Sequence, residues 1–156
     1  KILASLESKG IRIVVDATKD LLLNVLKYHP FLIKPNNHEL GEMFGTVCKT
    51  DEDIIRYAKK LQEMGAVNVL ISMAGDGAIL ITEDGQNIKM GTPKGKVVNS
   101  VGAGDSMVAG FITGYIRGGN YEEALKSGTA AGSATAFSEG LASLEMYEKM
   151  LKQITE

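Results

Sequence analysis

The residues best suited to chemistry lie at positions 99–111, where small residues surround one acid. The sequence reads NSVGAGDSMVAGF, so that Gly102, Ala103 and Gly104 directly precede Asp105 and an apolar helical pattern follows. Small residues let a backbone approach an anion closely, and the first turn of a helix offers free N–H groups and a positive dipole. A carboxylate there could accept a proton from a hydroxyl beside a phosphate. Residues 102–105, the anion turn, therefore indicate phosphoryl transfer, in which positioning and charge neutralisation dominate.

The anion turn also has a purely structural interpretation. Its glycines would let the helix start pack closely on a strand, and Asp105 would only balance the helix dipole. A bare Gly-x-Gly-Asp sequence favours that interpretation. The small pair Ala109 and Gly110, followed by Phe111 one turn onward, favours the functional one.

A second polar cluster is formed by Lys34, Asn36 and Glu39. Asn36 and Glu39 are three residues apart, on one face of a predicted helix start. Such a pair of hard oxygen ligands suits Mg²⁺, which keeps several waters and bridges to phosphates, and Lys34 could reach a nucleotide phosphate. A capping box explains the same spacing at least as well. Both can hold together, because a cap orients the same side chains.

A third cluster is a glycine-punctuated turn after a strand-like run. Ser72, Gly75, Asp76 and Gly77 could accommodate ribose or phosphates, but a plain tight turn explains them equally well. The P-loop pattern does not occur in the sequence, so a nucleotide site here would be of another type.

The elements that must position these clusters follow from hydrophobic periodicity, caps and turn residues. Helices are predicted at residues 1–9, 18–28, 36–45, 51–64, 103–118, 121–138 and 143–154, and strands at residues 11–16, 30–35, 67–73, 78–82 and 86–90. The strand at 11–16 is expected to be buried and parallel, and residues 50–53 resemble a capping box with Asp in place of Glu. Strands alternating with helices predict a layered α/β domain with a mainly parallel sheet. Ligands bind at the carboxyl ends of such strands, so the three clusters could share one sheet edge.

Composition excludes several other classes of function. The chain has 156 residues, 44% of them hydrophobic, and a net charge of −2, which is typical of one globular domain and argues against nucleic-acid or membrane-surface binding. Cys48 is the only cysteine, so no internal disulfide is possible, which fits a reducing cytoplasm. No apolar run is long enough to span a bilayer. The chain begins without Met inside a predicted helix, so we expect a fragment or part of a longer chain.

Other catalytic arrangements find little support. His29 and His38 are poor candidates for chemistry, no His/Cys cluster has zinc spacing, and Ser100 and Ser106 have no plausible histidine partner for a hydrolase triad. The small residues at 129–136 predict either close helix packing or a flat wall for an adenine ring, and the residues alone leave these alternatives open.

The stretch at 99–112 closely resembles the second signature of the ribokinase/PfkB family of carbohydrate kinases. The clusters Lys34-Pro-Asn-x-x-Glu39 and Ser72-x-x-Gly75-x-Gly77 resemble two further motifs of that family, in the same order. The likeness covers essentially the whole chain and is greatest for the phosphosugar branch. It implies a ribokinase-like α/β/α fold, of which residues 1–156 form the C-terminal nucleotide-binding and catalytic portion. The family's N-terminal part, with its sugar-binding residues and β-sheet lid, would be missing.

The resemblance implies a role for each matching residue. Asp105 would be the catalytic base, residues 102–104 the anion hole, and Asn36 and Glu39 the organisers of Mg²⁺, directly or through water. The nucleotide would contact Lys34, Asn36, Ser72, Gly75, Asp76, Gly77, Val97, Met107, Thr129, Gly132 and Ser133. Some members bind a monovalent cation such as K⁺ through backbone carbonyls, which here would fall near Asn99, Val101, Thr135, Ser138 and Gly140.

The implied activity is ATP-dependent phosphorylation of a ketohexose phosphate. Fructose 1-phosphate is the first expectation, and tagatose 6-phosphate or fructose 6-phosphate are alternatives within the family. A hydroxymethylpyrimidine-type kinase of the wider fold fits the anion turn less well. From a different class, the chain could be a catalytically silent nucleotide-binding module. The fragment alone is expected to be inactive, and the complete protein to be a homodimer through the missing lid.

Overall fold

The structure is a computed structural model that describes residues 2–7 and 9–155. The chain forms two compact units, Lys1–Met73 with Ile79–Ile88, and Ala74–Ala78 with Lys89–Glu156. Its elements are α1 (Ile2–Glu7), β1 (Val14–Val15), α2 (Lys19–Val25), η1 (Leu26–Tyr28), β2 (Leu32–Ile33), α3 (Asn37–Met43), α4 (Asp51–Glu63), β3 (Asn68–Ser72), η2 (Ala74–Asp76), β4 (Ala78–Ile81), β5 (Asn87–Met90), α5 (Ala103–Gly118), α6 (Tyr121–Ala136) and α7 (Leu144–Thr155). Among the described helices, none is long and apolar enough to cross a membrane.

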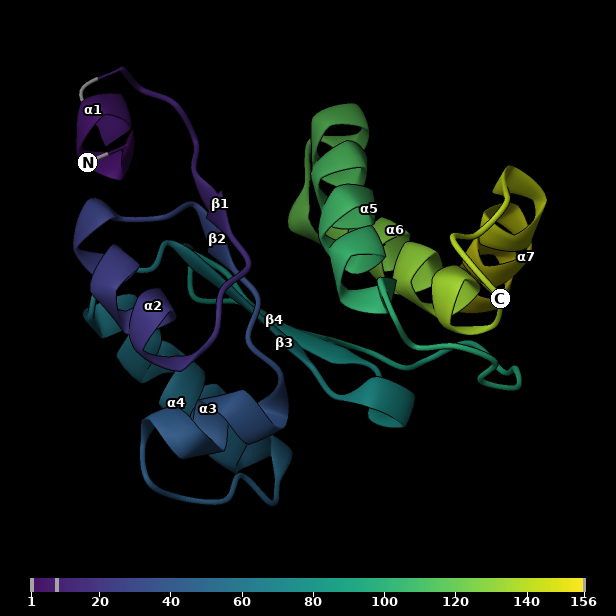
Figure 1. Cartoon of the computed structure of the whole chain (residues 1–156), viewed down its shortest axis with the longest axis horizontal. Helices are drawn as coiled ribbons and strands as arrows, with labels where there is room; N and C mark the ends of the chain where they lie inside the picture. Colours follow the sequence, from purple (N-terminus) through teal and green to yellow (C-terminus); the bar gives the residue numbers. More distant parts are fainter. Residues whose placement is uncertain (1, 8, 156) are drawn as a thin grey trace. The chain divides into compact units, whose positions relative to one another are not determined.

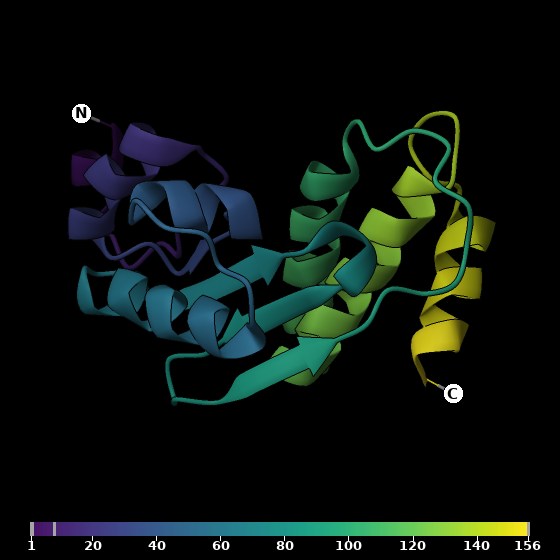
Figure 2. The same ribbon diagram turned by 90° about the horizontal axis from the view of Figure 1, so that it is seen from below.

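The strands form one sheet in the order β1-β2-β3-β4-β5. β1, β2 and β3 are parallel, with Val15 opposite Ile33 and Ile33 opposite Val69. The connections from β3 to β4 and from β4 to β5 are too short for a parallel crossover, so these pairs are hairpins. Figure 2 shows β3, β4 and β5 as neighbouring teal strands, with η2 at the end of β3.

The core of the first unit lies between the sheet and the helices α2, α3 and α4, which gather on one side of the strands (Figure 1). Val69 and Ile71 of β3 point into this core, whereas Leu70 between them points to the opposite face and is also fully buried. A sheet buried on both faces explains why β3 and β4 are apolar at nearly every position rather than alternating.

The second unit is built around the close packing of α5 on α6, with α7 beside α6 (Figure 2). Glycines form the contact: a Cβ added at Gly110 would lie 2.6 Å from Ser127 O, and one at Gly128 would lie 2.9 Å from Met107 O. Of the two alternatives for the small residues at 129–136, close helix packing is confirmed for Gly132. A Cβ there would lie 3.1 Å from Ala103 O.

The predicted elements are all found, with the helix at 51–64 and the two helices after residue 102 ending within two residues of their predicted limits. Three predictions need correction. The strand at 11–16 contains only Val14–Val15 and is half-buried, and the strand at 30–35 contains only Leu32–Ile33. The capping box at residues 50–53 is only half formed. Thr50 Oγ1 accepts from Asp53 N–H at 3.2 Å, but Asp53 Oδ2 accepts from the N–H of Lys49, 3.2 Å away.

Candidate active site

The first unit carries the predicted pair Asn36 and Glu39 at the start of α3. The two form a complete capping box: Asn36 Oδ1 accepts from Glu39 N–H, and Glu39 Oε2 accepts from Asn36 N–H, both at 2.8 Å. Asn36 also pairs with Ser72 in a parallel bridge, because both residues follow neighbouring parallel strands. The structure therefore brings together three of the predicted site residues, Asn36, Glu39 and Ser72.

Lys34 lies two residues before this cap and is only 8% exposed. Its ammonium group is 3.4 Å from Asp16 Oδ2, whose side chain is about one-third exposed. A buried ammonium group needs such a partner, because removing it from water costs several kcal/mol. Asp16 is not among the predicted site residues. The register of β1 against β2 could have revealed it, since Asp16 and Lys34 each come directly after paired residues, Val15 and Ile33.

The capping oxygens could also take part in binding a divalent cation. Each accepts one hydrogen bond within the box, which leaves a lone pair on Asn36 Oδ1 and the second carboxylate oxygen of Glu39 for water or metal. In the described part of the chain, no group of three or more His, Cys, Asp and Glu side chains could hold a metal ion. A pair of oxygen ligands such as Asn36 and Glu39 fits an ion that keeps most of its waters and is shared with phosphates, as Mg²⁺ is.

The turn after β3 belongs to the second unit and contains two glycines that differ in their surroundings. Gly77 has a φ of +90°, and a Cβ there would lie 2.0 Å from Met90 O, so close packing alone requires glycine. A Cβ on Gly75 would meet nothing within 4 Å. Open space over Gly75 and the neighbouring exposed Asp76 leaves that backbone accessible to a ligand.

The anion turn forms the start of α5. Gly102 is the N-cap residue, with a left-handed φ of +79°, and Asp105 is the third residue of the helix. Within this turn, Ala103 N–H donates to Ser100 O at 3.2 Å and Ser106 N–H donates to Gly102 O at 2.9 Å. The N–H groups of Gly104 and Asp105 and the helix dipole are therefore what would favour an anion at this point. Asp105 is exposed, so its carboxylate is accessible from solvent. The structure thus places an acid and backbone donors in one turn.

The loop before the anion turn is tied to the end of α6. Val98 N–H and Asn99 N–H donate to Ala136 O at 2.8 and 3.1 Å, and Asn99 Nδ2 donates to Glu139 O at 3.2 Å. Val101 N–H in turn donates to Asn99 Oδ1. The segments that hold the predicted cation-binding carbonyls are therefore neighbours, although they are about 40 residues apart in the sequence.

The predicted adenine-lining residues have very different exposures. Val97 is 61% exposed in the loop before the anion turn, whereas Met107 and Ser133 are 8% exposed and Thr129 is 1% exposed. Thr129 Oγ1 is buried without a hydrogen-bond partner, alone among the buried side-chain oxygens and nitrogens of the described residues. Leaving such a group unpaired costs about 1–3 kcal/mol.

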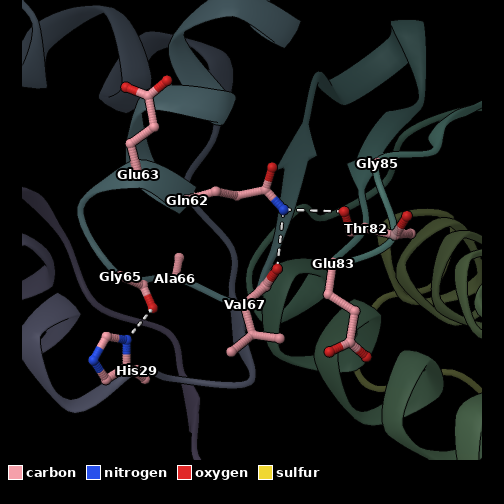
Figure 3. A pocket seen from close by; sticks show the side chains of 9 residues that line it. All are labelled: His29, Gln62, Glu63, Gly65, Ala66, Val67, Thr82, Glu83 and Gly85. Atoms are coloured by element: carbon pink, nitrogen blue, oxygen red, sulfur yellow. Dashed lines mark hydrogen bonds between the residues drawn. The ribbon is translucent and has the colours of Figure 1, made fainter.

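A separate hollow of about 420 Å³ lies in the first unit and contains none of the predicted site residues (Figure 3). On one side Gln62 donates to the carbonyls of Val67 and Thr82, at 3.0 and 3.1 Å, and on the other His29 Nδ1 lies 3.1 Å from Gly65 O. These bonds join loops at the start of β3 and the end of β4. We interpret the hollow as structural.

Cys48 is also outside the candidate site. It is buried, and burial, followed by the neighbouring Asp53, raises the pKa of its thiol. A thiol kept protonated is a poor nucleophile and a poor metal ligand, so Cys48 has no evident part in the chemistry.

Comparison with known proteins identifies the family of this chain. The sequence pattern described as "pfkB family carbohydrate kinase" matches residues 1–146. The chain belongs to the pfkB family. The chain is 47% identical to the 1-phosphofructokinase of Bacillus subtilis over 154 residues, which is 99% of this chain and 50% of that protein. It is 40% identical to the D-tagatose-1-phosphate kinase of Bacillus licheniformis over 145 residues, or 92% of this chain and 47% of that protein.

Solved structures of pfkB-type kinases support the fold. Phosphofructokinase-2 from Escherichia coli, solved in complex with substrates and products and also with potassium, is 28% identical, with a TM-score of 0.90. The similarity covers 99% of this chain and 51% of that protein. The ribokinase-like α/β fold is therefore confirmed. The chain spans about half the length of the relatives it matches.

Proposed function

We propose that the protein to which this chain belongs transfers a phosphoryl group from ATP to a ketohexose phosphate. The substrate we favour is fructose 1-phosphate, which would give fructose 1,6-bisphosphate. The observation that carries the proposal is the start of α5, where Asp105 follows a left-handed Gly102 in the first turn of the helix. The names of the relatives, 1-phosphofructokinase and D-tagatose-1-phosphate kinase, support the substrate class.

In this proposal the second unit performs the chemical step. The oxygen of the sugar hydroxyl attacks the γ-phosphorus, and the bond from that phosphorus to the oxygen of the leaving ADP breaks. Asp105 accepts the proton of the attacking hydroxyl. The N–H groups of residues 102–104 stabilise the charge that develops on the transferred group. Adenine would contact Val97, Met107, Gly132 and Ser133, and also Thr129, whose unpartnered hydroxyl it could satisfy. A monovalent cation such as K⁺ would bind backbone carbonyls near Asn99, Val101, Thr135, Ser138 and Gly140.

The first unit supplies phosphate and metal binding. Lys34, held by Asp16, provides a positive charge for a nucleotide phosphate. Asn36 and Glu39 would hold Mg²⁺ through water, and the ion would neutralise phosphate charge. Ser72 of this unit would contact the nucleotide. In the second unit, we assign nucleotide contacts to Gly75, Asp76 and Gly77.

We propose further that residues 1–156 are the C-terminal portion of one kinase domain, since the relatives are about twice as long. The portion that selects the sugar and forms a lid would then lie outside this chain. For this reason we expect the 156-residue chain alone to bind nucleotide without turning over a sugar. The complete protein would be a homodimer through the lid and would work in the cytoplasm.

The substrate can be tested with the complete protein in a coupled assay of ADP release. We expect kcat/KM with fructose 1-phosphate to exceed that with tagatose 6-phosphate or fructose 6-phosphate by at least about tenfold, since each missing polar contact in a sugar site costs that much or more. A higher kcat/KM with tagatose 6-phosphate or fructose 6-phosphate would identify the protein as a kinase of that sugar phosphate within the same family. Nucleotide binding without turnover of any sugar phosphate would favour the silent module.

Asn36→Asp separates the capping role from the nucleotide role. Aspartate caps a helix as well as asparagine does, so the free energy of unfolding should stay within about 0.5 kcal/mol of wild type. The added negative charge should weaken binding of ATP in the absence of Mg²⁺ about tenfold or more, because it opposes the phosphates with no metal ion to offset it. Denaturant unfolding and calorimetry measure the two effects, and Asn120→Asp at the cap of α6 is the matched control. Unchanged affinity of Asn36→Asp for metal-free ATP would leave Asn36 with a capping role only.

A further inference from the structure

The last turn of α6 contacts the polypeptide on both sides of the anion turn. On the entering side, Ala136 O accepts hydrogen bonds from the N–H groups of Val98 and Asn99. On the leaving side, the Thr135 hydroxyl donates to Ser106 Oγ at 2.8 Å. Two consecutive residues of one helix therefore fix both ends of the turn that holds the acid.

The Thr135 side chain makes this contact from a buried position, whereas Ser106 is half-buried. Thr135 is 1% exposed, and its hydroxyl oxygen also accepts from Ala142 N–H, 3.4 Å away in the loop after α6. The hydroxyl thus joins the first turn of α5, the last turn of α6 and the following loop. Losing the hydroxyl removes both of these hydrogen bonds, and a part-buried partner left unsatisfied costs more than an exposed one.

We propose that Thr135 is a positioning residue for the phosphoryl transfer. Its hydroxyl holds the first turn of α5 through the hydrogen bond to Ser106. This contact fixes the position of the Asp105 carboxylate relative to the N–H groups of the anion turn. This inference rests on the proposed function. Thr135 itself does not reach the reacting atoms, so its effect falls on the rate of transfer and leaves nucleotide affinity nearly unchanged.

The hydroxyl can be removed without changing the shape of the side chain. Thr135→Val is isosteric and lacks the hydroxyl, whereas Thr135→Ser keeps the hydroxyl and lacks the methyl group. In the complete protein, we expect Thr135→Val to lower the single-turnover rate with MgATP and fructose 1-phosphate about tenfold, with the affinity for MgATP within about twofold. Thr135→Ser should stay within about twofold of wild type. Ser106→Ala should match Thr135→Val, and the double variant should be no slower than either.

A second measurement does not depend on activity. Hydrogen–deuterium exchange at Ser106 N–H, which donates to Gly102 O, and at the amides of the second turn of α5 should be about fivefold faster in Thr135→Val and in Ser106→Ala than in wild type or Thr135→Ser. If wild type is inactive on every sugar phosphate, the proposed function fails, while the exchange rates still test the positioning role. The role of Thr135 is overturned by wild-type exchange in Thr135→Val, by equal losses in the valine and serine variants, or by losses that multiply in the double variant. Should Thr135→Val fail to fold, Ser106→Ala carries the same test.

Discussion

Asp105→Asn in the complete protein is expected to abolish phosphoryl transfer and leave nucleotide binding intact. The substitution preserves the shape of the side chain and removes the carboxylate that would accept the proton of the sugar hydroxyl. General bases contribute about 100- to 10,000-fold to rate, so kcat should fall by that range. The affinity for MgATP should change less than about threefold, because the N–H groups of the anion turn remain. Steady-state kinetics and calorimetry measure the two effects.

Asp53→Asn is the matched control, because Asp53 occupies the same third position of α4 that Asp105 occupies in α5. Both acids favour the positive end of a helix dipole, which contributes about 0.3–1 kcal/mol. Asp53 also accepts a hydrogen bond from Lys49 N–H and pairs with Arg56, so if Asp105 only balances the dipole, Asp105→Asn should lose no more stability than Asp53→Asn, and neither variant should lose activity. Normal turnover in Asp105→Asn would remove this residue as the base.

Gly110→Ala is expected to have the largest effect on stability. An added Cβ would lie 2.6 Å from Ser127 O and 2.7 Å from Ala131 Cβ, so α5 and α6 would have to move apart. Overpacking of this kind costs about 1–3 kcal/mol, although alanine is intrinsically the better helix former by about 1 kcal/mol. For a chain of this size, we expect the melting temperature to fall by about 3–10 °C.

Gly118→Ala provides the comparison within the same helix. The added Cβ would lie 2.8 Å from Glu123 Cβ, which is fixed by the backbone, so the exposed first turn of α6 would have to shift slightly. At Gly110 the nearest atom is instead a backbone oxygen between the two packed helices, so we expect Gly118→Ala to lower the melting temperature less than Gly110→Ala does. A melting temperature for Gly110→Ala equal to that of wild type would mean that α5 and α6 pack less closely than described.

The sequence predicts much of the local structure because its signals are local. Asn36 with Glu39 three residues later marks the cap of α3, and Gly119 followed by Asn120 marks where α5 ends and α6 begins. The shortness of β1 and β2 could not be predicted. Strand length depends on pairing between segments, and an apolar run such as residues 11–15 fits a loop that packs on the core equally well.

The proposed functional residues likewise divide into those with a local sequence signal and those without one. Asp105 and its glycines form a continuous motif and are visible in the sequence. Asp16 is not, because its importance comes from an ion pair with Lys34 that depends on strand register. Thr135 is similar, since its contact with Ser106 joins two helices across 29 positions. Side chains that act through tertiary contacts leave no local pattern, and only the packed structure reveals them.

The most direct test of the central claim is to identify the product by phosphorus NMR. The complete protein would be incubated with MgATP and fructose 1-phosphate, with Asp105→Asn in parallel. We predict that wild type forms ADP and fructose 1,6-bisphosphate in equal amounts, and that Asp105→Asn forms them at least about 100-fold more slowly. Release of phosphate from ATP with the sugar unchanged, or equal product formation by the two proteins, would contradict the assignment of the anion turn to sugar-phosphate phosphorylation.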